Sequence, residues 1–249
     1  MQVGFFFWPY SLDLCEQLAQ RADRYDYAMI GIADTPGNAM DPWVAMTLVA
    51  AETRRVRLPL CVTNIVTRQP AITAAAAASV ALVAGPRAIL GIGAGHSGVL
   101  NLGGAPAPAD ALHEAIVFMK TLLRGEPATY GGARAHLPWV RHPVPVYLAG
   151  SGPAALGVAG AVADGAFVNY GLEADLVRQA RDRVAAGAAT AGRAVSALDV
   201  WHIACLDCAE RREAALERLG NILGFVGAIH PRPRPGSPRR AGGPRARQS

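Results

Sequence analysis

The sequence is poor in charged residues and lacks a long uninterrupted apolar run. Asp, Glu, Lys and Arg make up only 17% of the 249 residues, whereas hydrophobic residues make up 51%. This balance excludes a chain that is disordered over most of its length. The best apolar stretch, 71–84, is mostly alanine and is interrupted by Thr73 and Ser79. A membrane-spanning helix needs about 18 apolar residues, so we expect no membrane contact.

Cysteine is scarce, and no Lys or Arg precedes Arg21. Four cysteines in a chain of this length do not form a disulfide scaffold, and the N-terminus lacks the basic start of a signal peptide. We therefore expect a cytoplasmic protein. His202, Cys205 and Cys208 do not make a zinc site, because residues three apart on a strand point to opposite faces. No metal site is predicted.

The net charge of +5 comes from one terminal segment. Residues 231–249 contain six arginines and no acid, and the rest of the chain has 18 basic and 19 acidic residues. The segment is rich in Pro and Arg and has no apolar period, so we predict that 231–249 is a disordered tail. The folded part is not basic, and we expect no nucleic-acid partner.

Short apolar runs alternate with longer helix-like stretches along most of the chain. The runs are mostly continuous, which is typical of parallel strands covered on both faces. We predict strands over 3–7, 27–33, 56–62, 88–92, 145–149, 165–169 and 198–205. We predict helices over 12–22, 41–54, 70–84, 109–124, 153–162, 173–191 and 209–223. Seven such units indicate an α/β protein with right-handed crossovers.

The arrangement of glycine and polar residues favours a barrel over an open doubly wound sheet. No Gly-x-Gly-x-x-Gly follows the first strand, where a dinucleotide-binding sheet would carry it. Polar or glycine-rich segments follow the strand ends instead, and in a barrel these ends meet at one mouth. We predict a TIM (β/α)8-type barrel over 1–230. It is incomplete, with about seven βα units, because the last strand is missing from a chain that looks truncated.

Several of these strand ends carry residues suited to binding. Gly91, Gly93 and Gly95 allow a flat ligand to approach the backbone, although an ordinary tight turn has the same pattern. The run from Gly150 to Pro153 opens a helix, so its free amides and Ser151 and Gly152 suit a phosphate; the alternative is a plain N-cap.

Other candidates at the mouth are polar side chains. Thr63 and Asn64 end the third strand, where Asn can donate and accept hydrogen bonds or simply stop the strand in a turn. Asp34 can orient a ligand or cap its own loop. His96 can act as a general acid or base near neutral pH, or it is an exposed loop residue.

Taken together, the passages 61–74 and 89–103, with Arg124-Gly-Glu, 145–153 and Ala163-Asp-Gly, resemble the luciferase-like monooxygenase family. Within that family these motifs are most similar to those of proteins like methylenetetrahydromethanopterin reductase. The resemblance implies a (β/α)8 barrel that binds FMN or the deazaflavin coenzyme F420, acts on a small organic substrate and forms a homodimer. It also implies a non-prolyl cis peptide, for which Cys61–Val62 is the matching bond.

The resemblance suggests roles for the mouth residues. Asp34, Thr63, Asn64 and Gly95 are predicted to contact the cofactor ring, and Ser97, Ser151 and Gly152 its phosphate. His96 is the candidate proton shuttle. Thr35 and His96 depart from the family, since its dehydrogenase branch has a histidine and a glutamate there. The sequence thus predicts a flavin-dependent oxidoreductase; the alternative is a catalytically silent truncated barrel that binds flavin weakly or not at all.

Overall fold

The computed structural model describes residues 1–229, with side chains as far as residue 220. The chain divides into two compact units, Met1–Ala204 and a second that begins at Cys205. The second unit contributes helix α8 (Arg212–Ile229), and all the strands belong to the first. The predicted disordered tail, 231–249, lies outside the described residues, and the predicted domain boundary at 230 stays a prediction.

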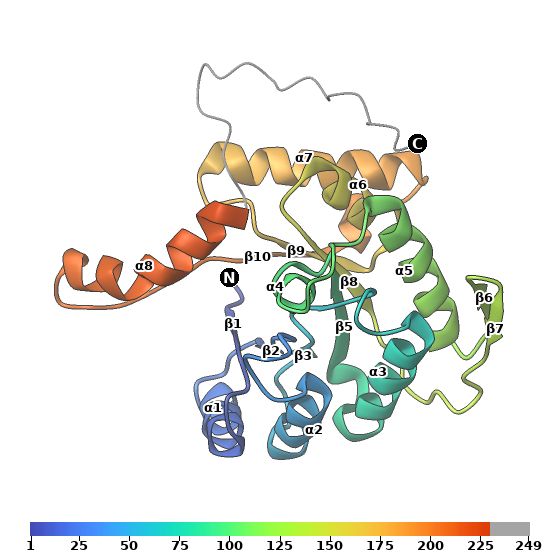
Figure 1. Ribbon diagram of the computed structural model, residues 1–249, viewed down its shortest axis with the longest axis horizontal. Helices are drawn as coiled ribbons and strands as arrows, with labels where there is room; N and C mark the ends of the chain where they lie inside the picture. The colour runs from blue at the N-terminus through green and yellow to red at the C-terminus, as the bar shows by residue number, and fades with distance from the viewer. Residues whose placement is uncertain (230–249) are drawn as a thin grey trace. The chain divides into compact units, whose positions relative to one another are not determined.

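The first unit is built on parallel strands that follow one another in chain order. Strand β1 pairs with β2, single bridges join β2 to the β3 segment, and the order then runs through β5, β8, β9 and β10. Figure 1 shows this run of strands with α1, α2, α3, α5, α6 and α7 around it. The strands are β1 (Gly4–Phe7), β2 (Met29–Ile32), β3 (Leu58–Pro59), β4 (Thr63–Asn64), β5 (Ala88–Gly93), β8 (Val146–Gly150), β9 (Gly165–Val168) and β10 (Asp199–His202). The predicted α/β barrel-type architecture is confirmed.

Helices α1 and α2 begin at residues whose side chains cap them. Ser11 accepts a hydrogen bond from the Leu14 amide, and Asp41 accepts one from the Trp43 amide with Pro42 in the first turn. Such caps satisfy amides that the helix itself leaves unpaired. The helices of the first unit are α1 (Leu12–Arg24), α2 (Pro42–Glu52), α3 (Pro70–Ala84), α4 (His96–Leu100), α5 (Ala109–Leu123), α6 (Pro153–Val162) and α7 (Ala174–Thr190).

The predicted strand over 56–62 is shortened to β3, Leu58–Pro59, and a second short strand, β4, follows it at Thr63–Asn64. Strands β3 and β4 both pair with β5, and the peptide bond between Cys61 and Val62 that separates them is cis, as the resemblance implied. A Cβ on Gly91 would lie 2.0 Å from the Leu60 oxygen, and one on Gly93 would lie 2.8 Å from a Val62 methyl. These two glycines therefore make room for the neighbouring strand. Their approach to a ligand stays a prediction.

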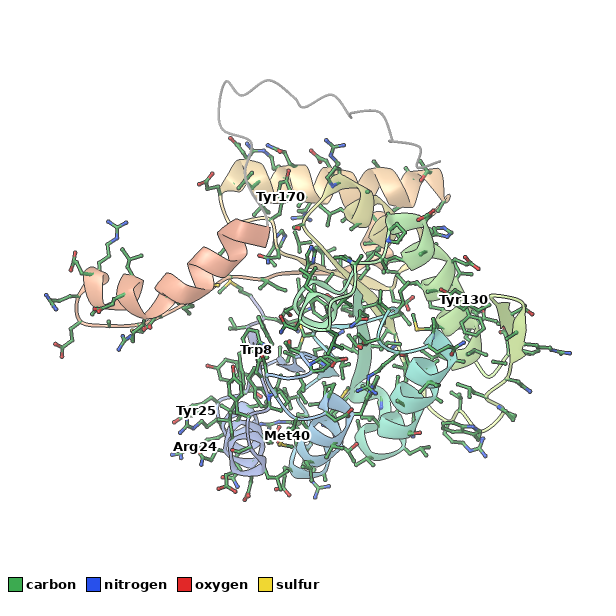
Figure 2. All side chains as sticks on the ribbon, in the orientation of Figure 1. Trp8, Arg24, Tyr25, Met40, Tyr130 and Tyr170 are labelled. Atoms are coloured by element: carbon green, nitrogen blue, oxygen red, sulfur yellow. The ribbon has the colours of Figure 1, made fainter. Side chains whose placement is uncertain are left out.

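A short antiparallel hairpin between α5 and β8 was not predicted. Strands β6 (Ala128–Tyr130) and β7 (Ala133–Ala135) are joined by Gly131 and Gly132, which both have positive φ, at 55° and 80°. Two such glycines are what a tight hairpin turn requires. Tyr130 packs its ring 5.2 Å from that of Phe118 on α5, and Figure 2 labels it beside that helix. The hairpin therefore packs against α5.

The strands carry apolar side chains on both faces. The larger cluster fills the space between the strands and the helices and includes Ile30, Leu90 and Leu148. Residues one position before these, Met29, Ile89 and Tyr147, form a second cluster with Phe167. Because successive side chains on a strand alternate, the second cluster lies on the inner face of the curved sheet. The core thus has the two layers that a barrel-type fold requires.

The inner face is polar at the amino ends of the strands. One carboxylate oxygen of Asp199 accepts hydrogen bonds from Arg57 at 2.7 Å, Tyr147 at 2.6 Å and Trp201 at 2.9 Å. Burial alone would raise the pKa of Asp199, but the three hydrogen bonds outweigh burial and hold its pKa below the ordinary value. The network links residues near β3, β8 and β10 at the end of the sheet opposite the predicted mouth.

Helices α6 and α7 touch through glycine. A Cβ on Gly187 of α7 would lie 2.0 Å from the Gly157 oxygen of α6, and one on Gly160 would lie 2.0 Å from the Val184 oxygen. Side chains of any size at these two positions would push the helices apart. Gly157 itself has open space where a Cβ would point.

We predict that Gly187→Ala lowers the free energy of unfolding by about 1–3 kcal/mol, because the added methyl group overlaps backbone. Gly157→Ala is the matched control on the partner helix, and it should leave stability unchanged or raise it by about 0.5–1 kcal/mol through helix propensity. Urea denaturation followed by circular dichroism measures both. Equal stability of the Gly187→Ala variant and the wild type would contradict this packing.

Candidate functional site

The predicted site residues follow the carboxyl ends of neighbouring parallel strands. Asp34 follows β2, Asn64 ends β4, Gly95 follows β5, and Ser151 follows β8. Asn64 pairs in register with Gly93, and Ile92 pairs with Leu148. Since parallel strands end at the same edge of a sheet, the four segments lie side by side at one mouth. The structure thus brings together the segments that the sequence singled out; their contacts with a ligand stay predictions.

Asp34 is the most buried acid at this mouth. Its side chain is 1% exposed, and its Oδ2 accepts a hydrogen bond from the Thr63 hydroxyl at 2.6 Å. Arg68 lies 3.7 Å from the same oxygen and also pairs with Asp41. Burial raises the pKa of Asp34 above its ordinary value, and the Thr63 hydrogen bond and the Arg68 charge lower it in part. Sequence reasoning missed Arg68, which lies four residues after Asn64.

Asn64 uses its oxygen within its own loop. The side-chain oxygen accepts hydrogen bonds from the Val66 and Thr67 amides at 2.9 and 2.8 Å, and from the Thr67 hydroxyl. The turn that the sequence offered as an alternative is therefore present. It also orients the amide, because the nitrogen must point away from these donors. Asn64 is 2% exposed, so what it can offer a ligand at the mouth is a donating NH2 group.

Gly95 allows the chain after β5 to pass close to Asn64. Its φ is +93°, a conformation that side chains rarely adopt, and a Cβ there would lie 2.4 Å from a Val99 methyl and 3.1 Å from the Asn64 Cβ. Gly98 makes a second close approach, since its Cβ would lie 3.0 Å from the backbone oxygen of Asp34. Helix α4 is thus held against the loops that follow β2 and β4.

A hydrogen-bonded chain across the mouth was not predicted. The Trp8 indole nitrogen donates to the Thr35 hydroxyl at 3.2 Å, and that hydroxyl lies 3.4 Å from the Ser97 hydroxyl. These residues follow β1, β2 and β5, so the chain links three strand ends; Figure 2 labels Trp8. The Phe6 ring lies 5.6 Å from that of Trp8. The only feature of the sequence that could have pointed to Trp8 as a site residue is its position after a strand, which the other site residues share.

The remaining predicted residues lie in the same region. His96 is exposed at the start of α4, and Ser151 is half-buried beside Gly152, the N-cap residue of α6. Among the described residues no side chain caps α6, and Pro153 occupies its first turn. The amides of that turn can therefore donate hydrogen bonds to an anion.

Three other kinds of feature were considered among the described residues: a cysteine nucleophile, a metal site and a membrane-spanning helix. Burial raises the pKa of the Cys61 thiol to about 12, so this cysteine stays protonated and is a poor nucleophile. Within residues 1–220, where side chains are described, no three His, Cys, Asp or Glu side chains lie close enough to share a metal ion. The same residues contain no helix with the length and apolar character that crossing a bilayer requires.

The mouth combines a carboxylate, amide and hydroxyl donors and an open helix terminus. A planar heterocycle with ring carbonyls and N–H groups needs acceptors and donors around its edge, and a phosphate needs free amides. The residues present fit a flavin-type cofactor on the chemistry of this donor set.

Comparison with known proteins agrees with this geometry. The chain is 32% identical over 222 residues to the 5,10-methylenetetrahydromethanopterin reductase of Methanolobus tindarius, covering 86% of this chain and 67% of that protein. The structure matches the coenzyme F420-dependent tetrahydromethanopterin reductase of Methanopyrus kandleri with a TM-score of 0.80 and 23% identity, covering 93% of this chain and 73% of the other.

A second solved structure is equally similar in fold. An F420-dependent secondary alcohol dehydrogenase in complex with an F420-acetone adduct matches with a TM-score of 0.80 and 22% identity, covering 90% of this chain and 75% of that one. The family model for luciferase-like monooxygenases matches residues 10–248. The chain therefore belongs to the luciferase-like monooxygenase family.

Proposed function

We propose that this chain is an oxidoreductase that binds F420 at the mouth and uses it on a small organic substrate. The family and the relatives support a flavin-type cofactor, and the names of two similar structures include F420. FMN is the alternative cofactor. The observation that carries the proposal is the convergence of Asp34, Thr63, Asn64 and Gly95 at one edge of the sheet.

The residues have distinct tasks at a bound ring. Asp34, held by Thr63 and Arg68, presents a carboxylate that can accept from a ring N–H group. Asn64 presents its NH2 group to a ring oxygen, because its own oxygen is bound by the loop. The bound cofactor supplies the redox chemistry, and the protein orients the ring and excludes water from it.

The phosphate and the proton have separate proposed sites. The first-turn amides of α6, with Ser151 and Gly152, would hold the cofactor phosphate at the positive end of the helix. His96 is exposed at the rim, so its imidazole can exchange a proton with water and pass it to the substrate. Ser97 is a further candidate for cofactor contact.

Titration of the purified full chain with F420 and with FMN, followed by fluorescence, tests the proposal. We expect saturable micromolar binding of F420, and weaker binding of FMN. Stronger binding of FMN would assign the other cofactor. Binding of neither compound by a protein that unfolds cooperatively would contradict the proposal and favour a catalytically silent barrel.

We predict that Gly95→Ala weakens F420 binding at least tenfold, because its methyl group would displace Asn64 and α4. Gly103→Ala is the matched control. Gly103 also has a positive φ, +74°, but a Cβ there has open space. Both variants place alanine at a positive φ, which is unfavourable, so both lose some stability. An equal loss of affinity in the two variants would show that the Gly95 contact with Asn64 does not shape the site.

We predict that cofactor binding weakens as the pH falls through the pKa of Asp34, because only the ionised carboxylate accepts a ring N–H. Thr63→Val removes a hydrogen bond that lowers this pKa, so the midpoint of the pH profile should move to higher pH. Thr63→Ser keeps the hydroxyl and should restore the wild-type midpoint. Fluorescence titrations between pH 4 and 8 measure the profile, and a midpoint that does not move in Thr63→Val would contradict the role of Asp34.

A further inference from the structure

The hydrogen bonds between Trp8, Thr35 and Ser97 have a defined direction. An indole N–H can only donate, so Thr35 must accept from Trp8. The Thr35 hydroxyl then keeps one proton of its own. Thr35 is 4% exposed, and a buried hydroxyl proton without an acceptor is costly. Its other hydrogen-bond partner among the described residues is the Ser97 oxygen at 3.4 Å, so Thr35 donates to Ser97.

The two residues that begin this chain are held in place. The Trp8 ring packs against that of Phe6 at 5.6 Å, with an angle of 57° between the ring planes. The backbone oxygen of Thr35 accepts hydrogen bonds from the Asn38 and Ala39 amides at 3.1 and 3.3 Å. Because the indole at one end is fixed, the Thr35 and Ser97 hydroxyl protons each have one preferred orientation.

Ser97 is the free end of the chain. Its oxygen accepts from Thr35, and among the described residues its own proton has no acceptor. Ser97 is half-buried and lies two residues after Gly95, beside the loop of Asn64. An oriented donor proton at the mouth suits a ligand atom that only accepts.

We propose that Ser97 donates a hydrogen bond to an oxygen acceptor of the bound cofactor, and that Trp8 and Thr35 are positioning residues that direct its proton. The inference rests on the proposed function for the identity of the ligand. The acceptor is either a ring carbonyl or a phosphate oxygen, since both are oxygen atoms without a proton.

The direction of the chain can be tested without any ligand. The protein has four tryptophans, and the Trp8 indole N–H can be assigned by NMR from its loss in Trp8→Phe. Thr35→Val should move this resonance because its acceptor is gone. Ser97→Ala should move it in the same direction by a smaller amount, because bonds in a chain polarise one another. The Trp43 indole, which is buried with no hydrogen-bond partner among the described residues, should not move and is the internal control.

Titrations identify the acceptor. Ser97→Ala and Thr35→Val should each weaken F420 binding about tenfold, the double variant no more than Ser97→Ala alone, and Trp8→Phe about threefold. Thr35→Ser keeps both hydrogen bonds and should bind like the wild type. The same variants are titrated with the phosphate-free deazaflavin chromophore of F420, and FMN is compared with riboflavin. Losses that persist without the phosphate assign the ring carbonyl, and losses that vanish assign the phosphate.

Three results would overturn the inference. If Ser97→Ala leaves the Trp8 resonance where it is, the three residues do not form one directed chain. If Ser97→Ala and Thr35→Val weaken binding additively, or Thr35→Ser fails to restore it, Thr35 does not act through Ser97. If the wild type binds none of the four compounds, the proposed function fails, whereas the ligand-free NMR comparison still decides the direction of the chain.

Discussion

The close approach of the β3–β4 segment to β5 is the constraint on which the site depends. Gly91 and Gly93 leave space for Leu60 and Val62, so the broken strand stays in register with β5 on both sides of the break. Asn64 and Thr63 are thereby placed at the carboxyl edge, where Thr63 meets Asp34. A larger residue at Gly91 would collide with backbone, which cannot move without breaking the pairing that positions these side chains.

The amino ends and the carboxyl ends of the strands carry different kinds of polar group. At the amino ends, Asp199 joins Arg57, Tyr147 and Trp201 in a network that links distant strands. At the carboxyl ends, the polar groups are oriented and keep donors and acceptors for a ligand. This division is typical of barrel enzymes, in which one end of the strands stabilises the fold and the other end carries chemistry.

Much of the fold could be predicted because its signals are local. Continuous apolar runs, the Ser11 and Asp41 caps and polar strand ends are each visible within a few residues of sequence. The site details required contacts across the fold. The Trp8–Thr35 hydrogen bond spans 27 positions and depends on the pairing of β1 with β2. The use of the Asn64 oxygen by its own loop could not be distinguished from a ligand contact, because both follow from the same residue type.

Hydrogen–deuterium exchange with and without F420 tests whether the four strand ends form a single site, because it reports where on the chain the cofactor acts. We predict that F420 protects amides in 34–40, 63–68, 94–101 and 151–156 together, and leaves the amino ends of the strands unchanged. Protection confined to one of these segments, or protection around Arg57 and Asp199, would contradict a single site at the carboxyl edge.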